Sequence, residues 1–180
     1  MDGYNCLGCS PNNPIGAHMR FYDSDANDVN ADIVSVWMPT YNHQSWINTL
    51  HGGMQTTLLD EVCGWVVFAK LQTSGVTAKM DIRYKKAVST VNGPIVLRAR
   101  LQSFVHRVAV VRGEIWCKMS AGTEYELAAF CECTYFTFNE QKALEMGYRR
   151  PQLSDEEMTL EQVIENVLQD KGKIVYRKLL

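Results

Sequence analysis

The segment from His51 to Glu61 contains residue types that can bind and activate a polar ligand. Two glycines, Gly52 and Gly53, stand where a helical pattern begins, although glycine is unfavourable inside helices. The first N–H groups of a helix have no intrahelical acceptor, and a residue without Cβ lets an anion approach them closely. The glycine pair therefore indicates either an anion- or oxyanion-binding helix start, or a tight turn with close backbone packing.

Asp60 is the residue of this helix best suited to acid–base or nucleophilic chemistry. An ionisable side chain in such an apolar helix usually has a partner or a task. Its carboxylate is expected to face open space, because its neighbours on the helix surface are small: Gly53, Thr56, Thr57 and Gly64. Such a carboxylate suits a general base or nucleophile, although a hydrogen bond to Thr56 or to buried backbone would also explain it. Glu61 points about 100° away and is at most a supporting residue.

The spacing of Gly52 and Asp60 limits how they can act together. They are eight residues apart, which separates them by about 12 Å along one helix. Groups that act on one carbonyl must lie within about 3 Å of it. If both residues act on the same carbonyl, they must come from different subunits, and a symmetric homodimer with two interfacial sites follows.

Composition excludes several classes of protein. The chain has 180 residues, 46% hydrophobic and 21% charged, the balance of one soluble globular domain. Eighteen Lys and Arg against 20 Asp and Glu give a net charge of −2, which argues against a nucleic-acid-binding protein. The longest apolar run, Val62 to Ala69, is too short to cross a membrane. No secretory signal is visible, so we expect a cytoplasmic protein with reduced cysteines.

Cys6 and Cys9 form a CxxC pair, an element of many zinc and redox sites. A structural zinc ion needs four ligands, and no second CxxC or HxxxH follows at a suitable spacing. A redox pair is expected between a strand and a helix, whereas Asn12, Asn13 and Pro14 follow this one. We therefore expect no metal or redox site here. Two further cysteines, Cys131 and Cys133, share one face of an expected strand and are predicted to be buried.

The elements on either side must position the His51–Glu61 segment. Residues 1–18 are predicted to be a loop segment, and apolar residues at helical spacing predict a long core helix over Gly52–Leu71. Strands are predicted over Met19–Tyr22, Ile33–Met38, Val76–Ala87, Pro94–Phe104, Ala109–Met119 and Leu127–Phe138. This order indicates an α+β fold, without the alternating βαβ units of a doubly wound sheet.

Two further predictions concern single strands. One face of the first strand after the helix is predicted to be buried, because its apolar residues alternate with polar ones; they are Val76, Ala78, Met80, Ile82 and Tyr84. Arg112-Gly113 is expected to be a bulge or a strand end.

Residues 140–180 are predicted to be a helical extension. Capping patterns start at Ser154 and at Thr159, before an apolar stripe from Leu160 to Leu168, and Gly172 is the expected stop. This extra C-terminal helix carries no residue that indicates chemistry, and it is expected to pack on the domain or on a partner subunit.

His-Gly-Gly, followed nine residues after the histidine by Asp60, resembles the motif of the hotdog-fold thioesterases, and most closely that of PaaI-type acyl-CoA thioesterases. The resemblance runs from about Met19 to Phe138, and Cys6–Gly16 is similar to the N-terminal segment of some members. It implies a hotdog domain over residues 19–139, with a long central helix wrapped by a mostly antiparallel sheet. It also implies a homodimer or a dimer of dimers that hydrolyses acyl-CoA, with no metal and no cofactor besides the coenzyme A thioester substrate.

The resemblance implies catalytic roles for three residues. Asp60 would act as base or nucleophile on the thioester, and the N–H of Gly52 would polarise the thioester carbonyl. Thr77, early in the strand after the helix, would assist water or an intermediate. Thr77 can also be explained without a function, because β-branched residues favour strands.

Further residues match substrate-binding positions of the family. His51 would order the loop and contact the substrate, with Gly53 beside it. Many members carry Asn or Gln six residues before the histidine, where ungapped counting places Ser45 and a shift of one residue places Gln44. The acyl pocket is expected beside the helix, lined by Met54, Leu58 and Trp46.

Coenzyme A carries phosphate groups, so an acidic protein needs local positive charge to bind it. Two basic regions match those that line the nucleotide groove in related enzymes: Arg83, Lys85 and Lys86, and His106 with Arg107. Each of these residues also fits a solvated charged face.

Two other functions remain open on the sequence. A non-catalytic acyl-CoA-binding protein would use the same fold, and Ser45 in place of the family's Asn or Gln favours it. A dehydratase of this fold would act on a hydroxyacyl thioester, but His-Gly-Gly at the helix start argues against it, since dehydratases generally carry a different motif there.

Overall fold

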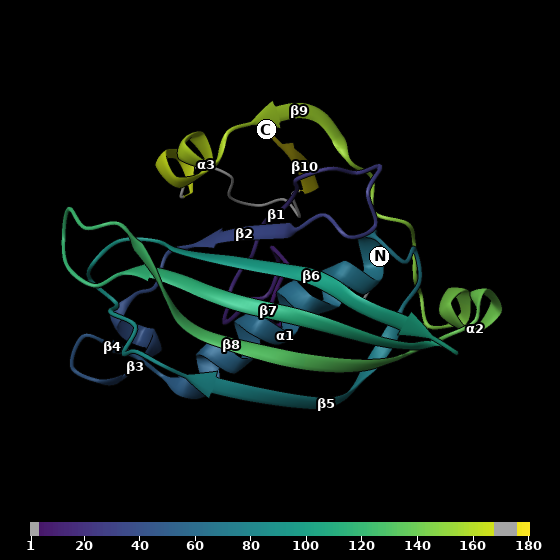
Figure 1. The fold of residues 1–180 in the computed structure, drawn as a ribbon, viewed down its shortest axis with the longest axis horizontal. Helices are drawn as coiled ribbons and strands as arrows, with labels where there is room; N and C mark the ends of the chain where they lie inside the picture. Colours follow the sequence, from purple (N-terminus) through teal and green to yellow (C-terminus); the bar gives the residue numbers. More distant parts are fainter. Residues whose placement is uncertain (1–3, 168–175) are drawn as a thin grey trace.

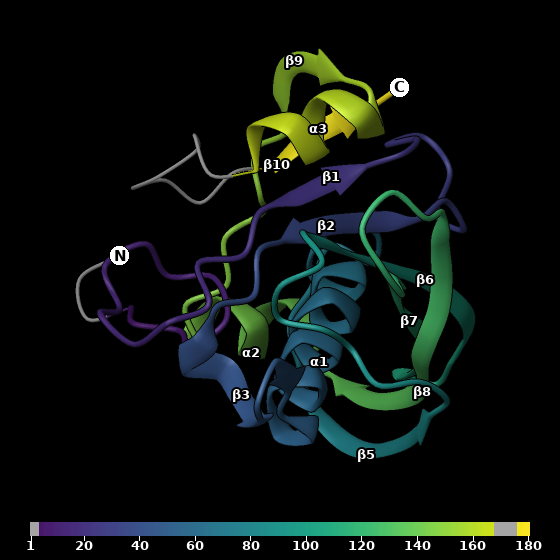
Figure 2. The same cartoon turned by 90° about the vertical axis from the view of Figure 1, so that its left-hand side faces the viewer.

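An eight-stranded sheet curves around one long helix, α1 (Gly52–Ala69), in the computed structural model, which describes residues 4–167 and 176–180 (Figures 1 and 2). The strand order is β5-β8-β7-β6-β2-β1-β10-β9. The strands span β1 Phe21–Asp23, β2 Ile33–Trp37, β5 Gly75–Tyr84, β6 Ile95–Val105, β7 Val108–Lys118, β8 Tyr125–Thr137, β9 Ser154–Met158 and β10 Tyr176–Leu179. Neighbours from β5 to β1 are antiparallel, whereas β10 runs parallel to β1 and β9. The predicted α+β hotdog architecture is confirmed.

Helix α1 begins at the predicted residue because His51 caps it. The Nδ1 atom of His51 accepts a 2.9 Å hydrogen bond from the N–H of Gly53, which satisfies one of the free donors of the first turn. A short hairpin, β3 (Gln44–Trp46) and β4 (Thr49–Leu50), leads directly into this turn, after the 3₁₀ turn Tyr41–His43. The backbone N–H of His51 donates to the carbonyl of His43 at 2.9 Å, which holds the hairpin against the helix start.

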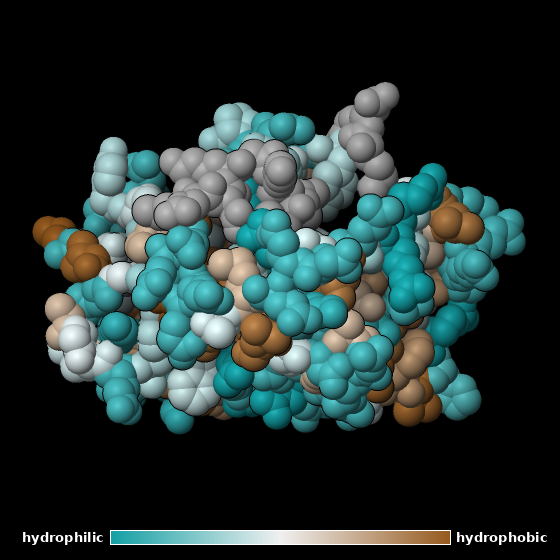
Figure 3. Space-filling view, turned by 90° about the horizontal axis from the view of Figure 1, so that it is seen from above, coloured by the Kyte–Doolittle hydropathy of each residue, from teal (hydrophilic) through white to brown (hydrophobic). Residues whose placement is uncertain are grey.

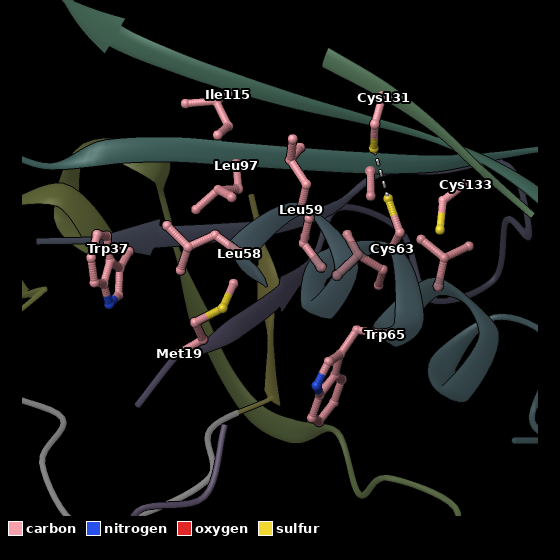
Figure 4. Close-up of a cluster of buried hydrophobic side chains, with 14 of the residues drawn as sticks. Met19, Trp37, Leu58, Leu59, Cys63, Trp65, Leu97, Ile115, Cys131 and Cys133 are labelled. Atoms are coloured by element: carbon pink, nitrogen blue, oxygen red, sulfur yellow. Dashed lines mark hydrogen bonds between the residues drawn. The ribbon is translucent and has the colours of Figure 1, made fainter. Parts of the chain in front are cut away.

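The main core lies between α1 and the concave face of the sheet (Figure 4). Leu59 and Cys63 point from the helix toward the strands, and Cys63 Sγ lies 3.8 Å from Cys131 Sγ. Cys131 and Cys133 are buried, as predicted. Gly113 lies inside β7 and marks neither a strand end nor a bulge; a Cβ there would lie 2.6 Å from Cys63 Sγ. The glycine is therefore required for the close approach of helix and sheet.

The predicted alternation of β5 is only half correct, because the strand contains a β-bulge. Thr77 pairs with Tyr135 and Lys79 with Thr134, so Ala78 has no partner in the register. Beyond the bulge, Met80 and Ile82 pack against the core as expected. Before the bulge the two faces are exchanged, so that Val76 is 48% exposed.

The C-terminal region is not simply the predicted helical extension. It forms α2 (Glu140–Glu145), β9, α3 (Leu160–Asn166) and β10. Thr159 caps α3 with a capping box, as one of the two expected patterns predicts, whereas Ser154 begins a strand. Strand β10 was not predicted. The expected stop at Gly172 and the end of the stripe at Leu168 lie outside the described residues.

Helix α3 covers the convex face of the sheet and forms a second, smaller core. Val163 of α3 packs there with Val34 of β2 and Leu179 of β10. All of β2 is consequently buried, since α1 covers its other face. A buried ion pair between Lys70 and Asp23, extended by the hydroxyl of Tyr176, joins the end of α1 to β1 and β10.

The face on the side of β9 and α3 is mainly hydrophilic (Figure 3). Among the helices that the structure describes, none combines the length and the apolar character that a bilayer crossing requires. The cytoplasmic location stays a prediction.

Candidate active site

The structure brings the two predicted residues Asp60 and Thr77 together. The hydroxyl of Thr77 donates a 2.8 Å hydrogen bond to Oδ1 of Asp60. The hydroxyl of Tyr135 lies 3.1 Å from the same oxygen and 2.8 Å from the backbone carbonyl of Asp60. Two hydroxyl groups therefore orient one oxygen of a half-buried carboxylate.

Sheet register and the β5 bulge create this arrangement. Thr77 and Tyr135 are cross-strand partners on β5 and β8, so both side chains point toward α1 at the level of Asp60. Without the bulge, an inward-facing Thr77 would be out of phase with Met80. One helical turn beyond Asp60, a Cβ at Gly64 would lie 3.8 Å from the Tyr135 hydroxyl, so the ring of Tyr135 packs closely against the helix.

The second carboxylate oxygen of Asp60 has no hydrogen-bond partner within the described residues. Cys133 is the other reactive side chain nearby, with Sγ 4.0 Å from Oδ1. Burial raises the pKa of the Cys133 thiol to about 12, so it remains protonated and is a poor nucleophile at neutral pH. Burial also raises the pKa of Tyr135, which keeps its phenol able to donate. The arrangement fits a carboxylate with one anchored and one reactive oxygen.

The start of α1 forms a separate part of the site. The N–H of Gly53 donates a hydrogen bond to the side chain of His51, whereas the N–H of Gly52 has no acceptor in the described part of the chain. A cleft of about 370 Å³ opens beside Gly52; it is lined by Gly52, Gln55, Tyr84, Lys85, Lys86 and Ala87. The hydroxyl of Tyr84 donates to the carbonyl of Gly52 at 3.1 Å and holds the end of β5 against the helix start. An anion in this cleft would meet a free helix N–H group.

Within one chain the two parts of the site stay separate. Gly52 and Asp60 lie on the same continuous helix, which places them about 12 Å apart along its axis. Thr56, predicted as an alternative partner of Asp60, bonds instead to the carbonyl of Gly52 and to Tyr84. A single carbonyl group cannot contact both Gly52 and Asp60 of one chain.

The hairpin before α1 holds the two candidate amide positions. Oε1 of Gln44 accepts a 2.9 Å hydrogen bond from the N–H of Asn48, and its amide nitrogen has no acceptor among the described residues. Ser45 is exposed. The shift of one residue to Gln44 therefore places an amide beside the helix start, while Ser45 carries only a hydroxyl.

The expected acyl-pocket residues are dispersed. Met54 is half-buried against the core and lies in the first turn of α1. Leu58 is fully buried in the core, and Trp46 is 80% exposed on the hairpin. The expectation that Leu58 and Trp46 line one pocket is therefore wrong for a single chain.

The basic residues predicted to line a coenzyme A groove lie in two separate places in one chain. Lys85 and Lys86 line the cleft at Gly52. Lys86 also pairs with Glu126, and Arg83 pairs with Asp81 beside it on the strand. Lys85 is the residue of this region whose side chain is most available to a ligand, since it forms no ion pair within the described residues.

His106 and Arg107 lie at the opposite end of the sheet. They form the β6–β7 turn, where both have a positive φ. The carbonyl of Arg107 accepts a hydrogen bond from the N–H of Thr137, which pairs with Gly75 at the first residue of β5. The length of β5 therefore separates this turn from Lys85, and one chain does not bring the two basic regions together.

Tyr135 is the residue that sequence reasoning missed. The available signal was its alternation with Cys131 and Cys133, which places all three on the strand face that meets the helix. A tyrosine on such a face needs a hydrogen-bond acceptor, and an acidic residue on the apolar helix is the obvious one.

Glu61 does not support Asp60. Its Oε1 accepts a 3.3 Å hydrogen bond from Nε1 of Trp65, and its Oε2 lies 3.3 Å from Sγ of Cys6 in the N-terminal segment. Burial raises the pKa of Glu61 to about 7, and hydrogen bonding with Cys9 lowers the pKa of Cys6 to about 5. These groups form a second cluster on the other side of α1.

Part of the chain matches a known protein family. Residues 47–121 match the model of the thioesterase superfamily, a range that includes the helix start, Asp60 and Thr77. No curated protein matches the chain significantly.

Several solved structures share the fold. A thioesterase superfamily protein is 22% identical over 73% of this chain and 62% of its own, less than two thirds of its length, with a TM-score of 0.61. A phenylacetic acid degradation-related protein from Ralstonia eutropha JMP134 is 21% identical over 68% of this chain and 86% of its own, with a TM-score of 0.56. A variant of an acyl-CoA hydrolase from Staphylococcus aureus is 14% identical over 61% of this chain and 68% of its own, with a TM-score of 0.56.

Proposed function

We propose that this chain, whose residues 47–121 match the model of the thioesterase superfamily, hydrolyses an acyl-CoA thioester to a free acid and coenzyme A. The observation that carries the proposal is the carboxylate of Asp60, with Oδ1 held by Thr77 and Tyr135 and Oδ2 free of partners within the described residues. A carboxylate oriented in this way can act on a carbonyl carbon without a metal ion.

Asp60 acts in one of two ways. As a general base it removes a proton from water while the water oxygen bonds to the thioester carbon. As a nucleophile it bonds to that carbon itself, and water then cleaves the resulting anhydride. In both routes the carbon–sulfur bond breaks, and the coenzyme A thiolate leaves and takes up a proton.

The negative charge that develops on the carbonyl oxygen needs a donor that Asp60's own chain cannot supply. Gly52 of a second copy supplies it, because its N–H has no acceptor within the described residues and lies at a positive helix end. A homodimer, or a dimer of such dimers, then contains two equivalent sites.

The edge of the sheet beside Asp60 is suited to such a pairing. β5 is an edge strand, and its backbone edge is open to a second copy in the described structure. Exposed apolar side chains lie along it and its neighbour β8: Val76 at 48%, Tyr84 at 51% and Phe136 at 55%. A dimer across this edge covers these side chains and places each Thr77–Asp60 pair at the interface.

The coenzyme A part of the substrate is placed at the cleft beside Gly52. Lys85 and Lys86 there offer positive charge to its phosphates. His51, Gly53 and Gln44 border the thioester, and Met54 borders the acyl group. In this dimer His106 and Arg107 contribute from the partner subunit, since their own chain holds them at the far end of β5.

The test is release of free coenzyme A from short-chain, long-chain and aryl acyl-CoA esters, comparing wild type with Asp60→Asn. Detection must not depend on thiols, because the chain has six cysteines. We expect turnover of at least one ester and a loss of about 100-fold or more in Asp60→Asn, the usual effect of removing a general base. A wild-type protein that binds acyl-CoA but turns over no ester would instead be an acyl-CoA-binding protein.

A further inference from the structure

Three metal-ligating side chains converge on the side of α1 that faces away from the sheet. The Sγ atoms of Cys6 and Cys9 and a carboxylate oxygen of Glu61 all lie within 4.8 Å of one another. They come from two segments, the N-terminal loop and the middle of α1, which are 55 residues apart in the sequence. In Figure 4 Trp65, the hydrogen-bond partner of Glu61, projects from α1 away from Ile115 of β7 and Cys131 of β8.

The loop is shaped to admit the carboxylate. Gly8 lies between the two cysteines, and a Cβ at this position would be 2.3 Å from Oε2 of Glu61. Any other residue would therefore force Glu61 out of the loop. The turn itself is held by the N–H of Ser10, which donates to the carbonyl of Cys6 at 3.2 Å.

Each of the three side chains also has its own hydrogen-bond partner outside the cluster. The N–H of Gly8 donates to Sγ of Cys6 at 3.2 Å, and the hydroxyl of Tyr4 lies 3.0 Å from Sγ of Cys9. Nε1 of Trp65 holds Oε1 of Glu61 and leaves Oε2 directed at the sulfurs. Donors arranged around the ligands in this way orient them and stabilise their charged forms in metal sites.

Within the described residues, the cluster has no positively charged partner. Glu61 forms no ion pair with a lysine, arginine or histidine among residues 4–167 and 176–180. Cys9 is 1% exposed, so solvent does little to stabilise charge there. Groups that become anionic in such surroundings are normally paired with a cation or bound to a metal.

We propose that Cys6, Cys9 and Glu61 bind one zinc(II) ion. Tetrahedral zinc with Zn–S near 2.3 Å and Zn–O near 2.0 Å separates sulfur from oxygen by about 3.5 Å. The observed distance from Cys6 Sγ to Glu61 Oε2 is 3.3 Å. Two thiolates select zinc over magnesium or calcium, which take oxygen ligands. Water completes the coordination on the side of Cys6, which is partly exposed.

The sequence alone concealed this site. Counting cysteine and histidine motifs finds two ligands and predicts no metal, whereas folding supplies the third from α1. The ion fastens the N-terminal loop to α1 through Glu61, the residue next to Asp60, whose side chain leaves the helix about 100° round from the one that Thr77 contacts. The protein supplies three of the four zinc ligands and water supplies the fourth, and the ion holds the N-terminal loop against the helix.

The experiment uses the full chain, reduced and stripped of metal by a chelator. Cobalt(II) is the probe, because thiolate coordination gives an intense ultraviolet charge-transfer band together with visible bands of tetrahedral cobalt. We expect one cobalt per chain, displaced by one equivalent of zinc. Zinc should also raise the Tm by about 5–10 °C at a free concentration about 100-fold above its Kd.

Three variants assign the ligands. Cys6→Ser and Glu61→Gln are expected to weaken zinc binding by about 100-fold or more, because each removes a ligand. Cys117→Ala is the matched control, since Cys117 is a thiol on β7 outside the cluster, and it should bind like wild type.

Two results would overturn the proposal. One is reduced wild-type protein that shows no charge-transfer band and no stoichiometric zinc. The other is a band that persists unchanged in both Cys6→Ser and Glu61→Gln. No acyl-CoA is present in these measurements, so they do not depend on the thioesterase proposal.

Discussion

The hydroxyl of Thr77 on β5 donates a 2.8 Å hydrogen bond to Oδ1 of Asp60 on α1. The bulge at Ala78 allows this contact, because it lets Thr77 face α1 while Met80 and Ile82 still pack against the core. The edge strand of the sheet thereby holds the carboxylate of the central helix in one orientation.

Loss of this hydrogen bond should impair turnover more than stability. Thr77→Ala is expected to lower kcat about 10- to 100-fold. This range follows from the free energy of a hydrogen bond to a charged group, which is about 1.5–3 kcal/mol. Thr77→Ser keeps the hydroxyl and should remain within a few-fold of wild type. Steady-state kinetics of both variants test this, and equal losses in Ala and Ser would contradict it.

Tyr135 offers a second test with a matched control. Tyr135→Phe removes the hydroxyl that contacts Asp60, and Tyr148→Phe removes one that donates to the carbonyl of Phe68 near the end of the same helix. Both should cost about 1–2 kcal/mol in the free energy of unfolding. Only Tyr135→Phe should lower kcat. Urea unfolding and kinetics on both proteins distinguish an orienting role from a purely structural one.

Lys85 should affect substrate binding and leave the chemical step unchanged. Lys85→Ala is expected to raise KM for an acyl-CoA about 5-fold with little change in kcat, since an exposed ion pair contributes at most about 1 kcal/mol. The effect should vanish with an acyl-pantetheine ester, which lacks the nucleotide phosphates. Lys142→Ala, on the exposed surface of α2, is the control. A fall in kcat would contradict the placement.

Two glycine-to-alanine changes should have opposite effects on stability. Gly113→Ala places a Cβ 2.6 Å from Cys63 Sγ and 2.9 Å from Cys131 Sγ, so overpacking should cost about 1–3 kcal/mol. Gly64→Ala meets only an ordinary contact at 3.8 Å and should stabilise α1 by about 0.5–1 kcal/mol. Thermal unfolding checks both signs. A stable Gly113→Ala would contradict the close approach of helix and sheet.

The helix start and the main strands could be predicted because local patterns determine them. Gly52 begins α1 as expected, since the glycine pair and the apolar stripe are visible in the sequence. The separate roles of Asp60 and Thr77 came from family resemblance, whereas the hydrogen bond between them was not predicted and is a finding of the structure. The bulge at Ala78 was invisible, because a single inserted residue leaves the apolar alternation apparently unbroken.

The features that were missed depend on contacts between distant segments. Tyr135 lies 75 residues from Asp60, and Cys6 lies 55 residues from Glu61. Strand β10 is short, has no alternation, and forms only because β1 and β9 flank it in parallel. Periodic patterns along the sequence do not predict such contacts, because the contacts form only when the chain folds.

The proposed site combines Asp60 of one chain with the backbone N–H of Gly52 of a second copy. This N–H can be removed without disturbing the helix. Gly52 is the first residue of α1, where proline is favoured, and His51 has φ −59° and ψ 135°, which a following proline tolerates. Gly52→Pro therefore deletes the N–H alone. We expect kcat to fall about 100- to 1,000-fold, as on loss of an oxyanion-hole donor, with a folded dimer retained.

The most direct test of the account is the activity of a purified heterodimer of Gly52→Pro and Asp60→Asn chains, isolated through two different tags. If each site combines Gly52 of one chain with Asp60 of the other, one of the two sites is intact and about half of wild-type activity returns. A wild-type chain paired with the double variant should then be inactive, because each site lacks one residue. Inactivity of the first heterodimer with half activity of the second would place both residues in one chain and contradict the account.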